Sequence, residues 1–330
     1  MRAGGPNPVP APSLRPWAAL MRPFRVAEAR ASRAWCARPR AHREALSLAT
    51  HQILGLGQPW TFHQLSSGPD AVLALHGTGA SSHSFLPLAR CLEGQVALWA
   101  VDLPGHGASP LAPGFRPTRT ALAASLGAAL AAFSKPWSLA VGHSASAAIL
   151  AEWALAPNPG VPRPPLAFLA PALTPLTGLR RWVFPAAARF FSLQPRWLTP
   201  SPGAGAAEKL AERLVADTGS RVPPAQLEGY AKLLREPAHL AGALAMMRHW
   251  DLRSLGPRLR QLPVPVRVLW GDRDRTYLRP PEVLFGAKLP QASWVTFPGL
   301  GHLLHEEAPA RVAPFLALPW RSAERMRSGL

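Results

Sequence analysis

Short apolar runs alternate with longer helical patterns through most of this chain. Residues 60–65 (WTFHQL) alternate apolar and polar positions with a period of two, which is typical of a strand with one buried face. The other runs are apolar almost throughout, as in strands that are buried on both faces of a sheet. They are AVLALH (71–76), VALWAVD (96–102), WSLAVGH (137–143), LAFLA (166–170), VRVLWG (266–271) and SWVTF (293–297).

Helical patterns occupy intervals between these runs. Residues 118–133 (TRTALAASLGAALAAF) and 146–156 (SAAILAEWALA) are both predicted to be helices. Apolar strands that are interleaved with helices predict an α/β fold, with a mostly parallel central sheet and helices on both faces.

One long interval breaks this alternation. Residues 171–260 contain no convincing strand, but 206–219 (AAEKLAERLVADTG) and 238–250 (AHLAGALAMMRHW) have helical patterns. A helical insertion between two parallel strands is expected to cover the carboxyl edge of the sheet, where folds of this kind place their sites. We therefore predict a helical cap at residues 172–258.

Enrichment in proline and arginine sets the first 45 residues apart, because apolar periodicity breaks at each proline. We expect residues 1–45 to be a disordered leader, 46–320 to be the folded domain with its cap, and 321–330 to be a flexible basic tail. A targeting peptide, or a start codon assigned too far upstream, would also explain the leader.

Composition narrows the class of partner. Of 330 residues, 48% are hydrophobic, which supports a substantial core, and 36 basic against 18 acidic residues give a net charge of +18. Nearly all the basic residues are arginines spread along the chain, without a Lys/Arg stripe between exposed aromatics, so no nucleic-acid partner is predicted. Contact with an anionic membrane surface or an acidic partner stays open.

Two further features favour a cytoplasmic protein. No stretch approaches the ~20 consecutive apolar residues that a membrane-spanning helix needs. Cys36 and Cys91 are far apart and belong to no C-x-x-C motif, so the sequence indicates neither a disulfide framework nor a zinc site.

Residues 139–150 (LAVGHSASAAIL) have the pattern of a nucleophile elbow. A strand ends at Gly142, Ser144 follows two residues later, and Ser146 precedes a line of alanines. The residues that flank the nucleophile must be small, because a tight turn holds the serine above the sheet. Ser144 is therefore the predicted nucleophile, although small residues after a strand are common in any α/β turn.

A serine hydroxyl needs a base and an orienting acid, which follow it in the order Asp then His in this arrangement. Asp272 and Asp274 follow the strand at 266–271, and His302 lies in a glycine-flanked loop after the last strand. We predict His302 as the base and Asp274, which lies further into its loop, as the acid. Considered alone, His302 could be a surface loop histidine, and Asp274 could be a turn carboxylate or a helix cap. Their order after successive strand ends favours the catalytic interpretation.

A glycine-rich turn opens the segment HGTGASSHSF (76–85), directly after a strand. Glycines let the backbone approach a ligand closely, so we predict that the N–H groups of Thr78 and Ala145 form an oxyanion hole. No metal ion or cofactor is predicted, and the chain has no phosphate-binding G-x-x-x-x-G-K-[ST] motif. The remaining candidate histidines lack the spacing of a metal site and are interpreted as structural; they are His83, His106, His143 and His305.

Several segments together resemble the α/β-hydrolase fold over residues 50–318, approximately: HGTGASSHSF, DLPGHGAS (102–109), VGHSASAAIL, WGDRD and GLGHLLHEE. HGTGASSHSF and three cap segments together are similar to the magnesium-chelatase accessory proteins of bacteriochlorophyll synthesis. The three cap segments are LAPALTPLTGL (169–179), LVADTGSRV (214–222) and LAGALAMMRHWDLRSL (240–255). The chain departs from that family at Ser146, where glycine is more usual, and in its long basic leader.

This resemblance implies an accessory role in magnesium insertion into protoporphyrin, with chelatase subunits as partners and with ATP use left to those partners. Two mechanisms stay open. Ser144, His302 and Asp274 would hydrolyse an ester, thioester or similar acyl bond in a small hydrophobic substrate, or the cap would hold a tetrapyrrole or a chelatase subunit while the three residues stay idle.

Aromatic side chains of the cap, together with Met246 and Met247, would suit a flat apolar ligand, although such residues more often form the core of a cap. They are Trp182, Phe184, Phe190, Phe191, Trp197 and Trp250. The alternative outside the chelatase family is a free-standing serine esterase or hydrolase acting on a hydrophobic ester, or else a dehalogenase or peroxidase of the same fold. A dehalogenase is disfavoured, because its nucleophile is an aspartate.

Overall fold

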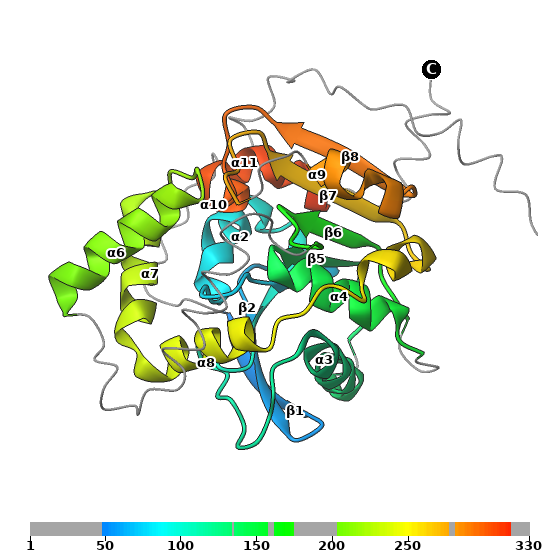
Figure 1. Cartoon of the computed structure of the whole chain (residues 1–330), viewed down its shortest axis with the longest axis horizontal. Helices are drawn as coiled ribbons and strands as arrows, with labels where there is room; N and C mark the ends of the chain where they lie inside the picture. The colour runs from blue at the N-terminus through cyan, green and yellow to red at the C-terminus, as the bar shows by residue number, and fades with distance from the viewer. Residues whose placement is uncertain (1–47, 134, 158–161, 175–202, 277–280, 318–330) are drawn as a thin grey trace, which may run out of the picture.

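Eight strands form one sheet in the computed structural model, which describes residues 48–133, 135–157, 162–174, 203–276 and 281–317 (Figure 1). The strand order is β1-β2-β4-β3-β5-β6-β7-β8, in which β2 pairs antiparallel with β1 and β4 and all other neighbours are parallel. This confirms the predicted α/β fold with a mostly parallel central sheet. The strands are β1 Ala49–Gly55, β2 Gln58–Gln64, β3 Asp70–Leu75, β4 Val96–Asp102, β5 Leu139–His143, β6 Leu166–Leu169, β7 Val266–Gly271 and β8 Ala292–Phe297.

β1 is the one strand of this sheet that was not anticipated from the sequence. β2 to β8 correspond to the apolar runs, and β4, β5 and β6 are buried at every position. β1 lies at the edge of the sheet with most of its side chains exposed, so it has no apolar run. A two-residue turn joins it to β2, and both turn residues, Leu56 and Gly57, have positive φ (51° and 78°), as in a type I′ hairpin.

Helices cover both faces of the sheet. On one face α3 and α4 pack on a core that includes Trp60, Phe62 and Trp153, and on the other α2 and the C-terminal helices pack on a core that includes Phe85 and Leu304. The elements are η2 Ser82–Phe85, α2 Leu86–Leu92, α3 Arg119–Phe133, α4 Ala145–Leu155, η4 Gly256–Gln261, α9 Pro281–Phe285, η5 Gly286–Lys288, α10 Leu304–Glu307, α11 Pro309–Val312 and α12 Pro314–Ala317.

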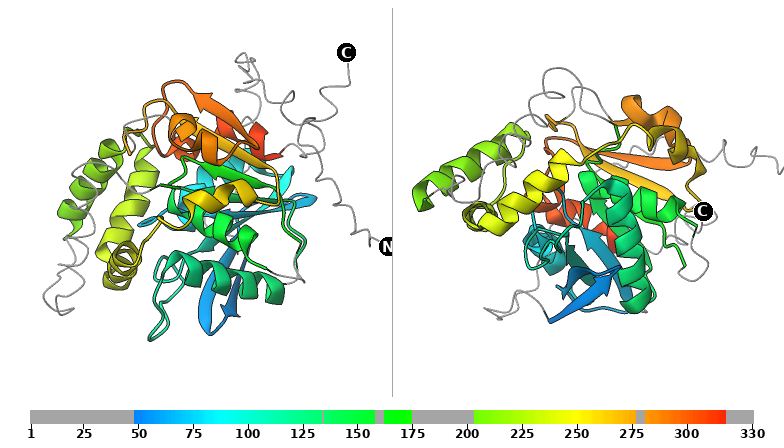
Figure 2. Two further views of the ribbon diagram at one scale, coloured as in Figure 1. Left: turned by 45° about the vertical axis from the view of Figure 1, so that its right-hand side comes forward. Right: turned by 60° about the horizontal axis from the view of Figure 1, so that its bottom comes forward.

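Three further helices lie between β6 and β7, and we call them the cap helices: α6 Ala204–Asp217, α7 Pro224–Arg235 and α8 Pro237–Arg248. They lie together to one side of the sheet (Figure 2). Ala207 and Ala211 of α6 form a small core with Ala231 of α7. The expected helical insertion is therefore present. Its bounds, 172–258, stay a prediction, because residues 175–202 are outside the described part of the chain.

Other expectations also concern residues that lie outside the described ranges. These are the leader (1–45), the tail (321–330), Cys36, and the cap aromatics Trp182, Phe184, Phe190, Phe191 and Trp197. Cys91 on α2 is buried and disulfide-bonded, contrary to the expectation of no disulfide. Within the described ranges, no helix is both long and apolar enough to cross a membrane.

Candidate active site

Ser144 connects β5 to α4 through a strained turn. Its φ of 53° and ψ of −116° lie outside the regions that a residue with a side chain normally adopts. Its N–H donates to the carbonyl of Leu169 (2.9 Å), and its own carbonyl accepts from the N–H of Ala172 (3.0 Å). A Cβ at position 142 would lie 2.9 Å from backbone atoms of Ser146 and Ala147, so only glycine fits there. These features are those of a nucleophile elbow.

Ser146 replaces the more usual glycine without disturbing the turn. Its side chain is buried, and its hydroxyl donates to the carbonyl of His76 (2.5 Å) at the end of β3. This hydrogen bond connects the elbow to the neighbouring glycine-rich turn. Glycine at position 146 could not make it, because glycine has no hydroxyl.

His302 and Asp274 come from the loops after β8 and β7 and contact each other directly. His302 Nδ1 lies 2.8 Å from Asp274 Oδ2, and both side chains are almost fully buried. The second carboxylate oxygen, Oδ1, accepts from the N–H of Thr276 (2.7 Å). Burial raises the pKa of Asp274, but the charge and hydrogen bond of His302 and the hydrogen bond from Thr276 outweigh it, so this pKa lies below its ordinary value. Asp272 is exposed and instead accepts from the N–H of Gly299 (2.7 Å).

His143 links the base to the elbow. Its ring centroid lies 4.9 Å from that of His302, and its Nε2–H donates to the backbone carbonyl of His302 (3.2 Å). Burial, together with the neighbouring rings of His305 and His302, holds the pKa of His143 well below its usual range. A neutral His143, directly before Ser144 in the chain, therefore contacts both the ring and the backbone of His302.

Thr78 lies in a four-residue turn from Gly77 to Ala80. The N–H of Ala80 donates to the carbonyl of Gly77 (3.1 Å), and Gly79 has a φ of 81°, as at the third position of a type II turn. A Cβ on Gly77 would lie 3.1 Å from Ser144 Cβ, so the turn lies directly against the elbow. Within the described residues, the N–H groups of Thr78 and Ala145 donate to no backbone or side-chain acceptor. We call residues 77–80 the oxyanion turn.

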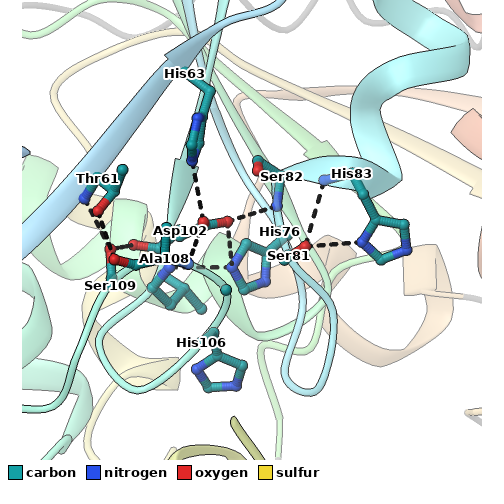
Figure 3. A network of polar contacts seen from close by, with 12 residues as sticks. Thr61, His63, His76, Ser81, Ser82, His83, Asp102, His106, Ala108 and Ser109 are labelled. Atoms are coloured by element: carbon teal, nitrogen blue, oxygen red, sulfur yellow. Dashed lines mark hydrogen bonds and ion pairs between the residues drawn. The ribbon is translucent and has the colours of Figure 1, made fainter. Parts of the chain in front are cut away.

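Asp102 ends β4 and connects three segments around this turn (Figure 3). Its carboxylate accepts from the N–H groups of Ser82 (2.7 Å) and Ala108 (2.8 Å) and from His63 Nε2 (3.1 Å). Burial raises the pKa of Asp102, but the hydrogen bonds from His63 and Ala108 and the charges of His76 and His63 outweigh it, so this pKa lies well below its ordinary value. The sequence pattern alone does not identify this arrangement, although the segment DLPGHGAS begins with Asp102. A Cβ at Gly107 would collide with this carboxylate.

A turn after α6 packs on the loops that carry His302 and Asp274. A Cβ on Gly219 would lie 2.0 Å from the carbonyl of Arg273, and a Cβ on Gly301 would lie 2.5 Å from Gly219. Ser220 Oγ accepts from the N–H of Leu303 (2.9 Å). The cap segment LVADTGSRV therefore has a direct structural role beside the candidate acid and base.

Two of the predicted apolar cap residues pack on the hydrophobic core that includes Trp60, Phe62 and Trp153. Met246 is a buried member of this core and its sulfur also lies 3.6 Å from Thr78 Oγ1, whereas Trp250 is partly buried against the same core. Within the described ranges, no cluster of three or more His, Cys, Asp or Glu side chains is arranged to hold a metal ion.

Comparisons with known proteins identify the family and the fold. A family model described as "Alpha/beta hydrolase family" matches residues 72–315. The chain is 32% identical to a "Magnesium-chelatase 30 kDa subunit" of Rhodobacter capsulatus, with 79% of this chain and 90% of the relative covered. It is 31% identical to a pimeloyl-[acyl-carrier protein] methyl ester esterase of Methylococcus capsulatus, with 63% and 77% covered.

Among solved structures, an esterase from Thermogutta terrifontis shares the fold, with a TM-score of 0.63 at 20% identity over 84% of this chain and 98% of that one. The resemblance to the chelatase accessory proteins is confirmed by the Rhodobacter relative. The chain belongs to the alpha/beta hydrolase family.

Proposed function

We propose that this chain is a serine hydrolase that cleaves an ester, thioester or similar acyl bond in a hydrophobic substrate. The observation that carries the proposal is the contact between His302 Nδ1 and Asp274 Oδ2 (2.8 Å). A carboxylate can only accept, so Nδ1 carries the proton and Nε2 of a neutral ring is left as an acceptor. Nε2 is then able to take the proton of the Ser144 hydroxyl.

In the proposed reaction Ser144 Oγ attacks the substrate carbonyl carbon while its proton passes to His302 Nε2. The resulting oxyanion accepts hydrogen bonds from the N–H groups of Thr78 and Ala145, each worth ~3 kcal/mol in the transition state. The intermediate collapses when His302 returns the proton to the leaving alcohol or thiol, which leaves an acyl group on Ser144. Water then attacks the acyl group with His302 as its base, and the free acid and Ser144 are regenerated.

The relatives support two parts of the proposal. The Methylococcus relative is named a methyl ester esterase, which favours ester hydrolysis. The Rhodobacter relative is named a subunit of magnesium chelatase. We infer that the biological setting is magnesium insertion into protoporphyrin in bacteriochlorophyll synthesis, where this chain acts as an accessory to chelatase subunits and magnesium is the substrate of those subunits.

A second candidate function is binding without catalysis, and the name of the Rhodobacter relative favours it, since that name specifies a subunit and no hydrolytic reaction. In this alternative a tetrapyrrole or a chelatase subunit binds beneath the cap helices, and Ser144 is idle.

A deletion strain complemented with Ser144→Ala separates the two functions. The substitution removes the nucleophile and leaves the fold intact, so loss of pigment supports catalysis and normal pigment supports binding alone. Ser138→Ala is the control, because Ser138 is exposed and its hydroxyl donates to the carbonyl of Ala71 (2.9 Å), away from the candidate site. The control strain should make pigment like the wild type.

A further inference from the structure

One face of α8 meets the loops around the candidate site. His239, Gly242 and Met246 are spaced by three and four residues, so they share a helix face. A Cβ on Gly242 would lie 2.0 Å from the carbonyl of Gly105, which shows how closely α8 approaches the loop after β4. Met246 reaches Thr78, and His239, only 4% exposed, lies at the opposite end of this face.

His239 joins two loops through its two ring nitrogens. The N–H of Gly107 donates to His239 Nδ1 (3.2 Å), so Nδ1 is an acceptor. Nε2 then carries the hydrogen and donates to the carbonyl of Gly79 (3.2 Å). Burial lowers the pKa of His239, which is consistent with this neutral form.

The carbonyl of Gly79 is the far end of the oxyanion turn. At the near end, the carbonyl of Gly77 accepts from His76 Nδ1 (2.8 Å) and from the N–H of Ala80 (3.1 Å). The N–H of Thr78 lies between these two attachments. The near end follows β3 after His76, whose side chain holds the carbonyl of Gly77, and His239 holds the far end from the cap.

We propose that His239 is a positioning residue that holds the oxyanion turn from the cap, so that the N–H of Thr78 faces the carbonyl that Ser144 attacks. The proposal rests on the serine hydrolase function proposed above. It makes α8 part of the catalytic arrangement, because a displacement of this helix would move the turn.

Two conservative substitutions separate the two hydrogen bonds of His239. In His239→Gln the amide nitrogen occupies the place of Nε2 and keeps a donor toward Gly79, whereas in His239→Asn the shorter side chain reaches only the place of Nδ1. With p-nitrophenyl butyrate as the probe, we expect the Asn variant to lose about 10- to 100-fold in kcat with little change in KM, since a small misplacement of the donor weakens transition-state binding alone. The Gln variant should keep most of the wild-type kcat.

His249→Asn is the matched control, because His249 follows α8 and makes no side-chain hydrogen bond within the described residues. Its kcat should equal that of the wild type. Equal kcat for the Asn and Gln variants, or a change in KM alone, would overturn the proposal. If His239→Asn does not fold, the Gln variant decides: retained kcat supports the proposal, and a tenfold loss contradicts it.

Hydrogen exchange of the peptide that covers residues 76–82 distinguishes a failure of this proposal from a failure of the proposed function. Exchange should be faster in His239→Asn than in the wild type, His239→Gln or His249→Asn. An inactive wild-type protein with this exchange pattern would reject the hydrolase function and keep the positioning role. Unchanged exchange in a folded Asn variant would reject the positioning role.

Discussion

Glu306 makes the stability of this protein depend on pH, and Glu306→Gln should remove that dependence. Glu306 lies on α10, four residues after His302, and is completely buried. Two residues of α7 donate to it: the Tyr230 hydroxyl to Oε1 (2.6 Å) and Gln226 Nε2 to Oε2 (2.7 Å). Burial outweighs these hydrogen bonds and raises the pKa of Glu306 to about 7 from its ordinary 4.5.

The direction of the pH dependence of stability follows from the raised pKa of Glu306. The native protein keeps a proton on Glu306 that the unfolded chain releases above pH 4.5, so the contribution of Glu306 to stability is fully present below pH 4.5 and is lost as the pH rises through 7. At ~1.4 kcal/mol for each unit of pKa difference, the loss reaches about 3 kcal/mol. Gln has nearly the same size and does not ionise, so the variant avoids this loss.

Urea unfolding of the wild type and Glu306→Gln at pH values from 5 to 8 measures the effect. From pH 5 to pH 8, the unfolding free energy of Glu306→Gln should rise by about 2–3 kcal/mol relative to that of the wild type. The other titrating groups are the same in both proteins, so their contributions cancel in this difference. The neighbouring His305, whose pKa burial lowers to about 3, stays neutral throughout. Glu212→Gln on the exposed surface of α6 controls for the loss of one negative charge. A difference that does not change with pH would refute the reasoning.

Two further substitutions test the elbow and the acid. Gly142→Ala places a Cβ 2.9 Å from the backbone of Ser146, so we expect it to lower the unfolding free energy by about 1–3 kcal/mol, measured by thermal unfolding. Gly205→Ala is the control, because its Cβ would point into open space, and it should not lower the unfolding free energy. Asp274→Asn should lower kcat by about 10⁴-fold, because an amide no longer selects the Nδ1–H tautomer of His302. Asp272→Asn should leave kcat near that of the wild type, since within the described residues the Asp272 carboxylate accepts only from the N–H of Gly299. If Asp272→Asn lost more kcat than Asp274→Asn, Asp272 would be the acid.

Features that depend on a tight turn or on the order of strand ends were accessible from the sequence. The small residues around Ser144 and the order of Asp274 and His302 predict the elbow and the acid–base contact, because tight turns and strand ends impose local rules. β1 escaped prediction because an exposed edge strand has no apolar run.

Contacts between distant segments were not accessible in the same way. His239 meets the oxyanion turn across 160 residues, and nothing in a helical pattern identifies the loop that such a histidine touches. Glu306, in the sequence HLLHEE, has the appearance of an exposed helix residue, and its burial depends on α7 packing over it. Tertiary packing therefore determined what local patterns could not predict.

Reaction with a fluorophosphonate probe, followed by mass spectrometry of the modified peptide, tests most directly whether Ser144 is an activated nucleophile. The probe reacts only with a serine whose proton is removed by a base and whose developing oxyanion is stabilised. We predict one probe adduct on Ser144 in the wild type, an equal adduct in Ser138→Ala, and no adduct in Ser144→Ala. A folded wild-type protein that stays unmodified, or that is modified at another serine, would contradict the proposed hydrolase function.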